Sequence, residues 1–318
     1  MRSLLLWIHK YFYTQKDLMQ NKRRNIMMWA VCEIIKRLSQ SAINCYLRCY
    51  AFMGIYPKPL RGRSDVIVSL TSFPKRIDVV WMAIDSMFHQ KQQPSRIYLY
   101  LTNEEFPGGR EQIPKRLLNY EKLGLEICFR EHNLKPHNKY FYALQEHYNK
   151  NVITIDDDIY YHDDTVKRLL EAHSIYPKFI CANRIDIITF DNAGMFEKYQ
   201  NWQKAKRKEM IKPSILNVAL GFVGVLYPSG MFTNCSKLFD IELIKKLSLN
   251  ADDLWLKAIE SIENIQVIKT KYCCMGVSIG GSQSISLMST NCHGENDIQW
   301  NRLVEEFNLI DIIKPDKE

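Results

Sequence analysis

The sequence predicts an α/β fold in which helices cover a mostly parallel sheet, preceded by a helical extension. Two observations carry this prediction. From Asp65 onward, short runs of β-branched and aromatic residues alternate with helix-type runs, as in doubly wound sheets. Before Asp65 the chain has helical periodicity and a strongly positive net charge, whereas the rest of the chain is slightly negative. We therefore divide the chain into an extension, residues 1–62, and a larger domain, residues 63–318.

The composition fits one globular domain with a modest extension, since the chain has 318 residues of which 46% are hydrophobic and 25% charged. The nine cysteines are odd in number and form no CxxC pair. This usage indicates a reducing compartment rather than a disulfide framework. We therefore expect a cytoplasmic protein.

The sequence of the extension predicts a basic amphipathic helix. Residues 1–63 contain twelve Lys and Arg against two acidic residues, a net charge of +10, whereas the rest of the chain carries −2. No uncharged run approaches the roughly 20 residues of a membrane span. The extension either binds an anionic membrane surface, peripherally on the inner face, or packs on the larger domain. Its apolar positions recur at helical spacing: Met27, Val31, Ile34, Ile35, Leu38, Ala42 and Cys45.

The larger domain contains five expected strands and five main expected helices. The strands are expected at 66–70, 96–102, 125–129, 152–155 and 179–182. The helices are expected at 78–89, 114–122, 137–148, 165–176 and 298–307. Ligands of such sheets bind beyond the carboxyl ends of the strands, so the segments that follow the strands are the candidate site.

The strand expected at 152–155 runs directly into three carboxylates. If the extended conformation continues, Asp156 and Asp158 lie on one side and Asp157 on the other. Like charges held close together repel unless a cation neutralises them, so this pair favours a divalent metal that grips a substrate diphosphate. The alternative is an acidic turn or a cap for the helix that begins near Asp164.

An apolar strand that ends in Asp156-Asp157-Asp158 resembles the DxD metal site of GT-A-type nucleotide-sugar glycosyltransferases, including those that build bacterial surface polysaccharides. The resemblance implies a GT-A (Rossmann-like) fold, a Mn²⁺ or Mg²⁺ ion and a nucleotide-sugar donor, with UDP-sugar favoured. It also implies a glycan or lipid-linked acceptor. Asp156 and Asp158 are then metal ligands, and Asp156 and Asp157 also contact the substrate.

The resemblance extends to two cationic positions. The loop after the first strand, 71–76, resembles the donor-binding loop, which makes Thr71, Pro74 and Arg76 candidate donor contacts. Arginine suits phosphate because its planar fork donates two hydrogen bonds. Lys139 resembles the lysine that precedes DxD in several such enzymes. The alternatives are an exposed turn for the loop and an ordinary surface lysine.

Three further elements complete the candidate site. Gly221 and Gly224 resemble the acceptor-side wall of the family, the alternative being a tightly packed strand. Asp253 resembles the base that deprotonates the acceptor in inverting enzymes, with Asp252 orienting the acceptor. Both also fit ordinary helix-start chemistry with Asn250 as N-cap. The last element is a late histidine, which often completes the metal site in this family, and His293 is the candidate third ligand.

Two other functions stay open. A sugar-nucleotide pyrophosphorylase shares the metal and the sheet, but it normally carries a glycine-rich basic loop after the first strand, and 71–76 contains no glycine. A non-catalytic, membrane-associated binding protein needs neither acidic cluster. No nucleic-acid-binding motif is present, so nucleic acid is not expected as a partner.

Overall fold

The computed structural model describes residues 1–20, 26–62, 65–204, 210–271, 275–281 and 294–313. Its helices are α1 (Arg2–Gln20), α2 (Ile26–Phe52), α3 (Trp81–Phe88), α4 (Lys115–Glu121), α5 (Asn138–Glu146), α6 (Thr165–Ile175), α7 (Ile241–Leu247), α8 (Asp252–Ile262), α10 (Asn296–Phe307) and α11 (Leu309–Ile312). Short 3₁₀ helices include η2 (Lys135–His137) and η4 (Gly221–Val223). Its strands are β1 (Val66–Thr71), β2 (Arg96–Thr102), β3 (Leu125–Arg130), β4 (Asn151–Thr154), β5 (Ile159–Tyr160), β6 (Ile180–Ala182), β7 (Ile185–Ile187), β8 (Gln203–Lys204), β9 (Ile211–Ser214), β10 (Asn217–Ala219), β11 (Val225–Tyr227), β12 (Val267–Lys269) and β13 (Val277–Ser278).

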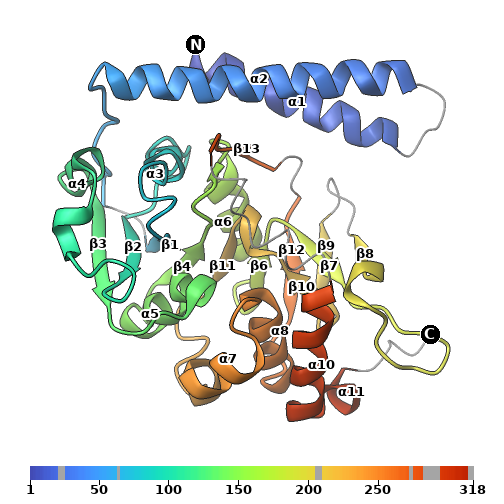
Figure 1. Cartoon of the computed structure of the whole chain (residues 1–318). Helices are drawn as coiled ribbons and strands as arrows, with labels where there is room; N and C mark the ends of the chain where they lie inside the picture. The colour runs from blue at the N-terminus through green and yellow to red at the C-terminus, as the bar shows by residue number, and fades with distance from the viewer. Residues whose placement is uncertain (21–25, 63–64, 205–209, 272–274, 282–293, 314–318) are drawn as a thin grey trace.

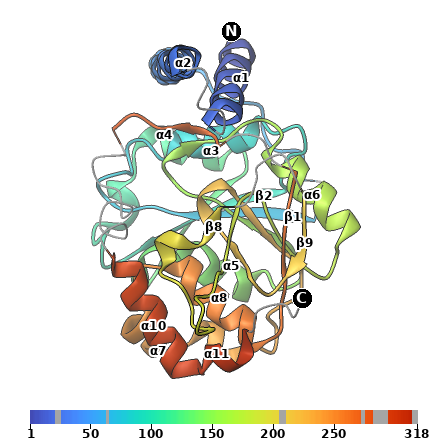
Figure 2. The ribbon, with the colours of Figure 1, turned by 90° about the vertical axis from the view of Figure 1, so that its right-hand side faces the viewer.

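The centre of the fold is an eight-stranded mixed sheet in the order β3-β2-β1-β4-β11-β6-β12-β9. Strands β3, β2, β1 and β4 run parallel to one another, and β12 runs parallel to β6. Strand β11 is antiparallel to β4 and β6, and β9 is antiparallel to β12. Helices cover both faces of this sheet (Figures 1 and 2). The predicted α/β (Rossmann-like) fold class, a mostly parallel sheet flanked by helices with a helical extension, is therefore confirmed.

The sheet is buried on both faces, as the alternation along β1 illustrates. Val68 and Leu70 join a hydrophobic cluster with residues of α3, α4 and α6. Ile67, which points the other way, joins a second cluster with residues of α5, α8 and α10. Apolar side chains on both sides of a strand are typical of parallel sheets sandwiched between helices.

Most predicted elements are confirmed, with boundaries shifted by a few residues, but two predictions are wrong. The helix expected from Asp78 begins only at Trp81, because residues 74–80 form turns. The glycine-containing strand expected near Gly221 starts as the 3₁₀ helix η4 and becomes extended only at Val225. Gly224 lies between the two parts with φ +97°, a conformation that favours glycine.

Helices α1 and α2 form a hairpin that lies along one side of the body, next to α3 and β13 (Figure 1). The helix predicted in the extension is confirmed, and most of its apolar stripe faces away from the body. Met27 and Leu38 of this stripe are 82% and 64% exposed, whereas α2 buries Cys32, Ser39, Ile43 and Leu47. No helix of the described residues is long and apolar enough to cross a membrane. The domain boundary at residue 62 stays a prediction.

Two buried histidines at the contact between α1 and the body predict a loss of stability in acid. The rings of His9 and His162 lie 5.6 Å apart. Burial and the nearby Lys36 lower the pKa of His9 to about 4. Burial, His9 and Lys10 lower the pKa of His162 to about 3, against the opposing effect of Asp164. The unfolded chain, where both groups titrate at about 6.5, therefore binds more protons once the pH falls below that value.

The stability contributed by the two neutral imidazoles is present above pH ~6.5 and is lost as the pH falls toward the folded-state values. We expect the free energy of unfolding to drop by roughly 1.4 kcal/mol per histidine per pH unit in this window. Urea unfolding at a series of pH values measures it. The double variant His9→Asn/His162→Asn should show a flatter pH dependence, and an equally steep one would contradict the assignment.

Candidate active site

The acidic segment lies at the carboxyl end of β4, beside the end of β1. The two strands are parallel, with Ile67 opposite Val152, and the pairing continues through a hydrogen bond from Ile155 N to Ser69 O at 3.0 Å. Because parallel strands end at the same edge, the residues after Ile155 and after Thr71 come together there. This is the location predicted from the sequence.

Two of the three carboxylates share Arg76, and the third contacts Lys139. Asp157 is buried and accepts hydrogen bonds from Ser72 Oγ at 2.6 Å and from Arg76 Nη1 at 2.5 Å. Asp156, on the other side, accepts a hydrogen bond from Lys139 Nζ at 2.7 Å. Asp158 Oδ2 lies 3.3 Å from Arg76 Nη1. Asp157 thus holds the loop after β1, while Asp156 and Asp158 keep exposed fractions of 30% and 15%.

Charge is concentrated at this strand end. Burial and the neighbouring Asp156 raise the pKa of Asp158 to about 7, against the opposing effect of Arg76. Burial also raises the pKa of Asp157, although Arg76 and Ser72 act in the other direction. A cation would favour the ionised form of Asp158, which burial and Asp156 disfavour.

Arg76 and Lys139 are both buried, at 8% and 5% exposed, so neither the solvated turn nor the surface lysine describes them. Burial alone would lower the pKa of Arg76, but Asp157 and Asp158 raise it. The guanidinium also lies over the Phe73 ring, 5.4 Å from its centroid. Arg76 is thus held in a fixed position at the end of the loop after β1. A guanidinium held in this way is suited to anion binding.

Lys139 joins the two acidic segments that the sequence places far apart. Its Nζ lies 2.7 Å from Asp156 Oδ1 and 2.9 Å from Asp252 Oδ2. Burial would lower its pKa, but Asp156, Asp252 and Asp253 together raise it well above the usual value. One buried ammonium therefore sits between the end of β4 and the start of α8.

The start of α8 differs from the prediction in one respect. Ala251, not Asn250, occupies the N-cap position, and its side chain makes no capping hydrogen bond. Asp252 and Asp253 form the first turn of the helix. These two neighbouring carboxyl groups have pKa values shifted in opposite directions. Burial acts to raise the pKa of Asp252, but its net shift is downward because of Lys139. Burial and Asp252 raise the pKa of Asp253 well above its usual value.

Gly221 lies close to both Asp253 and Lys139. Its N–H donates to Asp253 Oδ1 at 3.1 Å. A Cβ atom at this position would lie 2.9 Å from Lys139 Nζ and 3.1 Å from Asp253 Oδ1. Glycine is therefore required here for close approach to the charged groups rather than for backbone conformation.

The remaining predicted residues are less closely involved. Thr71 Oγ1 donates to Tyr100 O at 2.8 Å, and Pro74 is exposed. A Cβ atom at Gly224 would lie at ordinary contact distance from Leu169 and Asn183, so glycine is favoured there by its backbone conformation rather than by lack of space. His293 lies outside the described residues.

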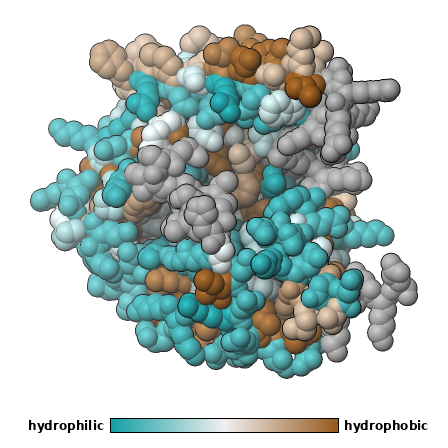
Figure 3. Space-filling view, turned by 45° about the vertical axis from the view of Figure 1, so that its right-hand side comes forward, coloured by the Kyte–Doolittle hydropathy of each residue, from teal (hydrophilic) through white to brown (hydrophobic). Residues whose placement is uncertain are grey.

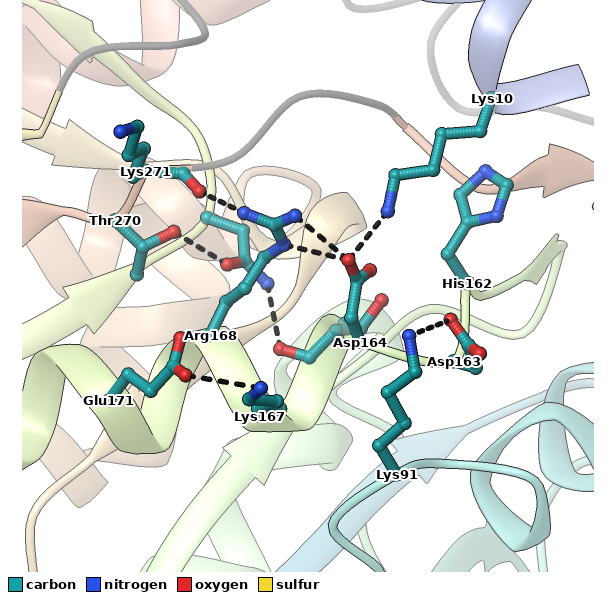
Figure 4. A network of polar contacts seen from close by, with 12 residues as sticks. Lys10, Lys91, His162, Asp163, Asp164, Lys167, Arg168, Glu171, Thr270 and Lys271 are labelled. Atoms are coloured by element: carbon teal, nitrogen blue, oxygen red, sulfur yellow. Dashed lines mark hydrogen bonds and ion pairs between the residues drawn. The ribbon is translucent and has the colours of Figure 1, made fainter. Parts of the chain in front are cut away.

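The predicted helix cap at Asp164 is also wrong in its chemistry. Asp164 occupies the N-cap position of α6, but its side chain makes no capping hydrogen bond. Its Oδ2 instead accepts from Lys10 Nζ at 2.5 Å and Arg168 Nη2 at 2.8 Å. Figure 4 shows Lys10 and Arg168 pointing toward this carboxylate from different elements.

Sequence reasoning missed two residues of the site. Ser72, the neighbour of Thr71, binds Asp157 directly. Tyr161 Oη accepts a hydrogen bond from Asp156 N at 2.8 Å and donates one to Phe222 O at 3.1 Å, so it ties the acidic segment to η4. The position of a hydroxyl side chain within the predicted donor loop could have identified Ser72. The spacing of Tyr161 in the sequence gives no such indication.

Among the described residues, no group of three His, Cys, Asp or Glu side chains is arranged to hold a metal ion. The donor set nevertheless fits a hard cation, because Asp156 and Asp158 are adjacent, partly exposed carboxylates. Mg²⁺ is commonly held by one or two carboxylates, with water and substrate phosphates supplying the other ligands.

Comparisons with known proteins give similarity to solved structures only. No family model matches the chain, and no curated protein matches it. Residues 1–349 of S. aureus TarS in complex with UDP match with a TM-score of 0.44 and 13% identity over 65% of this chain and 59% of that one. A CMP:2-keto-3-deoxy-manno-octonic acid synthetase complexed with CTP matches with a TM-score of 0.44 and 8% identity over 72% of this chain and 100% of that one. A 4-diphosphocytidyl-2C-methyl-D-erythritol synthase from Anaerococcus prevotii matches with a TM-score of 0.42 and 11% identity over 73% of this chain and 98% of that one. The chain thus spans about 60% of the TarS fragment.

Proposed function

We propose that this protein is a metal-dependent glycosyltransferase that moves a sugar from a nucleoside diphosphate, with UDP-sugar favoured, to a hydroxyl of a glycan or lipid-linked acceptor. The observation that carries the proposal is the position of Lys139 between Asp156 at the end of β4 and Asp252 at the start of α8. Through Lys139, the end of β4, whose Asp156 and Asp158 suit a metal, lies next to the start of α8. There Asp252 and Asp253 suit proton transfer.

The donor diphosphate is assigned to the edge formed by the ends of β1 and β4. Asp156 and Asp158 would hold Mn²⁺ or Mg²⁺, which supplies Lewis-acid stabilisation of the leaving diphosphate. Arg76 and Lys139 place two further positive charges at the same edge. Fixed cations directed at developing negative charge are the main means by which enzymes stabilise such leaving groups. Thr71 and Pro74 lie at the start of the same loop and are assigned to the nucleoside.

The acceptor is assigned to the side of Asp253, bounded by Gly221 and η4. A raised pKa makes a carboxylate a stronger base, provided that it lies within hydrogen-bond reach of the hydroxyl. In the proposed reaction Asp253 takes the acceptor proton while the acceptor oxygen bonds to the anomeric carbon. The bond from that carbon to the diphosphate oxygen breaks, and the nucleoside diphosphate leaves. Direct displacement inverts the anomeric configuration. Asp252, held ionised by Lys139, orients the acceptor.

The test is metal-dependent binding and hydrolysis of a panel of nucleotide sugars by the native chain and by Asp158→Asn. We expect selective, Mn²⁺- or Mg²⁺-dependent turnover of one donor, and a loss of at least about tenfold in metal affinity in the variant, a size typical of disturbed metal sites. Asp163→Asn is the matched control, because Asp163 is nearby and pairs only with the exposed Lys91 at 3.3 Å among the contacts described.

Equal activity of Asp158→Asn and the native chain would contradict the assignment of the metal. Indifference of the native chain to every donor would contradict the enzyme itself and favour a binding protein. Release of pyrophosphate from a nucleoside triphosphate and a sugar phosphate would instead identify a pyrophosphorylase.

A further inference from the structure

The helical hairpin contacts the body through a side that combines polar groups with the buried apolar residues Leu6, Ile43 and Leu47. Asn44 of α2 accepts a hydrogen bond from Gly280 N at 2.7 Å and donates one to Ser278 O at 3.1 Å. Arg48 donates to Gly280 O at 3.0 Å. In α1, Lys10 reaches down to Asp164 at the start of α6 (Figure 4). The groups that a water-facing helix normally turns outward are therefore used to fix the hairpin to the protein.

The opposite side of the hairpin is apolar and exposed. Thirteen of the nineteen large hydrophobic side chains that are exposed among the described residues belong to residues 1–55. Figure 3 shows hydrophobic residues gathered along the outer side of the hairpin, with hydrophilic residues beneath them. We name this surface the outer apolar face. It comprises the exposed apolar residues of the two helices: Leu4, Trp7, Tyr11, Ile26, Met27, Met28, Val31, Ile34, Leu38 and Phe52.

We propose that the outer apolar face inserts into the headgroup and upper acyl layer of an anionic lipid bilayer, so that α1 and α2 lie in the plane of the membrane. Contiguous exposed apolar surface of this extent marks an interaction site in a water-soluble fold. Trp7 and Tyr11, at 60% and 45% exposed, are the side chains that prefer the boundary between lipid and water. No membrane-spanning segment is needed for this mode of binding.

The charge of the hairpin selects an anionic surface. Residues 1–63 carry a net +10, and the side chains of Arg37, Lys58 and Arg61 are among those exposed. Basic residues beside an inserted apolar face add about 1 kcal/mol each near anionic lipid.

A second copy of this chain fits the same face less well. Pairing two hairpins face to face would bring two segments of +10 together, and like charges at an interface oppose association. An anionic leaflet attracts the same charges and covers the same apolar side chains. Charge complementarity therefore favours lipid over self-association.

The test is co-sedimentation of the full chain with vesicles of phosphatidylcholine alone and of phosphatidylcholine mixed with phosphatidylglycerol. We expect binding to the anionic vesicles that weakens as salt is raised. The variant Ile34→Gln/Leu38→Gln changes two residues that are 57% and 64% exposed, so it should fold normally. Its vesicle affinity should fall by at least about tenfold, because two apolar side chains no longer leave water.

The matched control is Ile175→Gln/Ile298→Gln, which alters two comparably exposed residues of α6 and α10, at 61% and 54%, outside the outer apolar face. It should bind vesicles as the native chain does. Native binding by Ile34→Gln/Leu38→Gln, or no binding by the native chain, would overturn the proposal. A native dimer that this variant converts to a monomer, measured by light scattering, without vesicle binding, would assign the face to a second copy instead. Vesicle binding is measured without turnover, so its result is independent of the proposed enzymatic function.

Discussion

Replacing Lys139 by Met is expected to lower the free energy of unfolding by about 3–5 kcal/mol, the usual cost of removing one partner from a buried ion pair. Methionine keeps an unbranched apolar side chain of similar length but removes the ammonium. Asp156 and Asp252, which lie 2.7 and 2.9 Å from Nζ, then lose their shared cation while Asp253 stays close to both. Urea unfolding at neutral pH measures the change.

Two variants make this prediction specific. Lys150→Met removes an ion pair with Asp65 whose carboxylate is 88% exposed, and it should cost less than about 1 kcal/mol. Adding Asp252→Asn to Lys139→Met should restore part of the stability, since one uncompensated charge is removed. Strictly additive effects, or a loss for Lys139→Met no larger than that for Lys150→Met, would show that Lys139 does not neutralise the acidic residues.

The Asp253→Asn variant is expected to turn over the nucleotide-sugar donor 10²–10⁴-fold more slowly, the usual contribution of a general base. Asparagine retains an oxygen that can accept the hydrogen bond from Gly221 N, so the site should keep its shape. Water serves as the acceptor in this assay, which measures the hydrolysis rate and the donor dissociation constant separately. The donor dissociation constant should change little.

The matched control for this substitution is Glu171→Gln, since Glu171 is 58% exposed and pairs only with Lys167 of the same helix among the contacts described. It should leave both quantities unchanged. A loss of donor binding without a loss of turnover at saturation would place Asp253 on the donor side of the site, contrary to the assigned role.

The sequence was sufficient to predict the features that depend on local patterns. The β-branched run before Asp156 predicts a buried strand, and the alternation of strands and helices predicts that its carboxyl end faces the end of β1. Both are confirmed by the pairing of β4 with β1. The period of two also predicted that Asp157 would point away from Asp156, as its bonds to Ser72 and Arg76 show. It further predicted that Asp158 would lie on the side of Asp156, but residues 157–158 form a turn and Asp158 shares Arg76 with Asp157.

The remaining features depend on tertiary contacts, which periodicity does not contain. Lys139 is the second residue of an ordinary-looking helix, and only the approach of α8 shows that it is buried between carboxylates. The side of α2 that contacts the body could not be predicted for a related reason, because periodicity reveals an apolar stripe without revealing what packs against it. Hydrogen bonds from Asn44 to Ser278 and Gly280 determine that side.

The shared position of Lys139 also constrains how this chain can vary. Residues 139, 156 and 252 come from three separate segments, yet each depends on the charge of the others through one ammonium. A substitution at any one of them leaves an unbalanced buried charge unless another changes with it. Among related chains these three positions should therefore covary, as contacting residues do, and a relative without the lysine should also lack at least one of the two carboxylates.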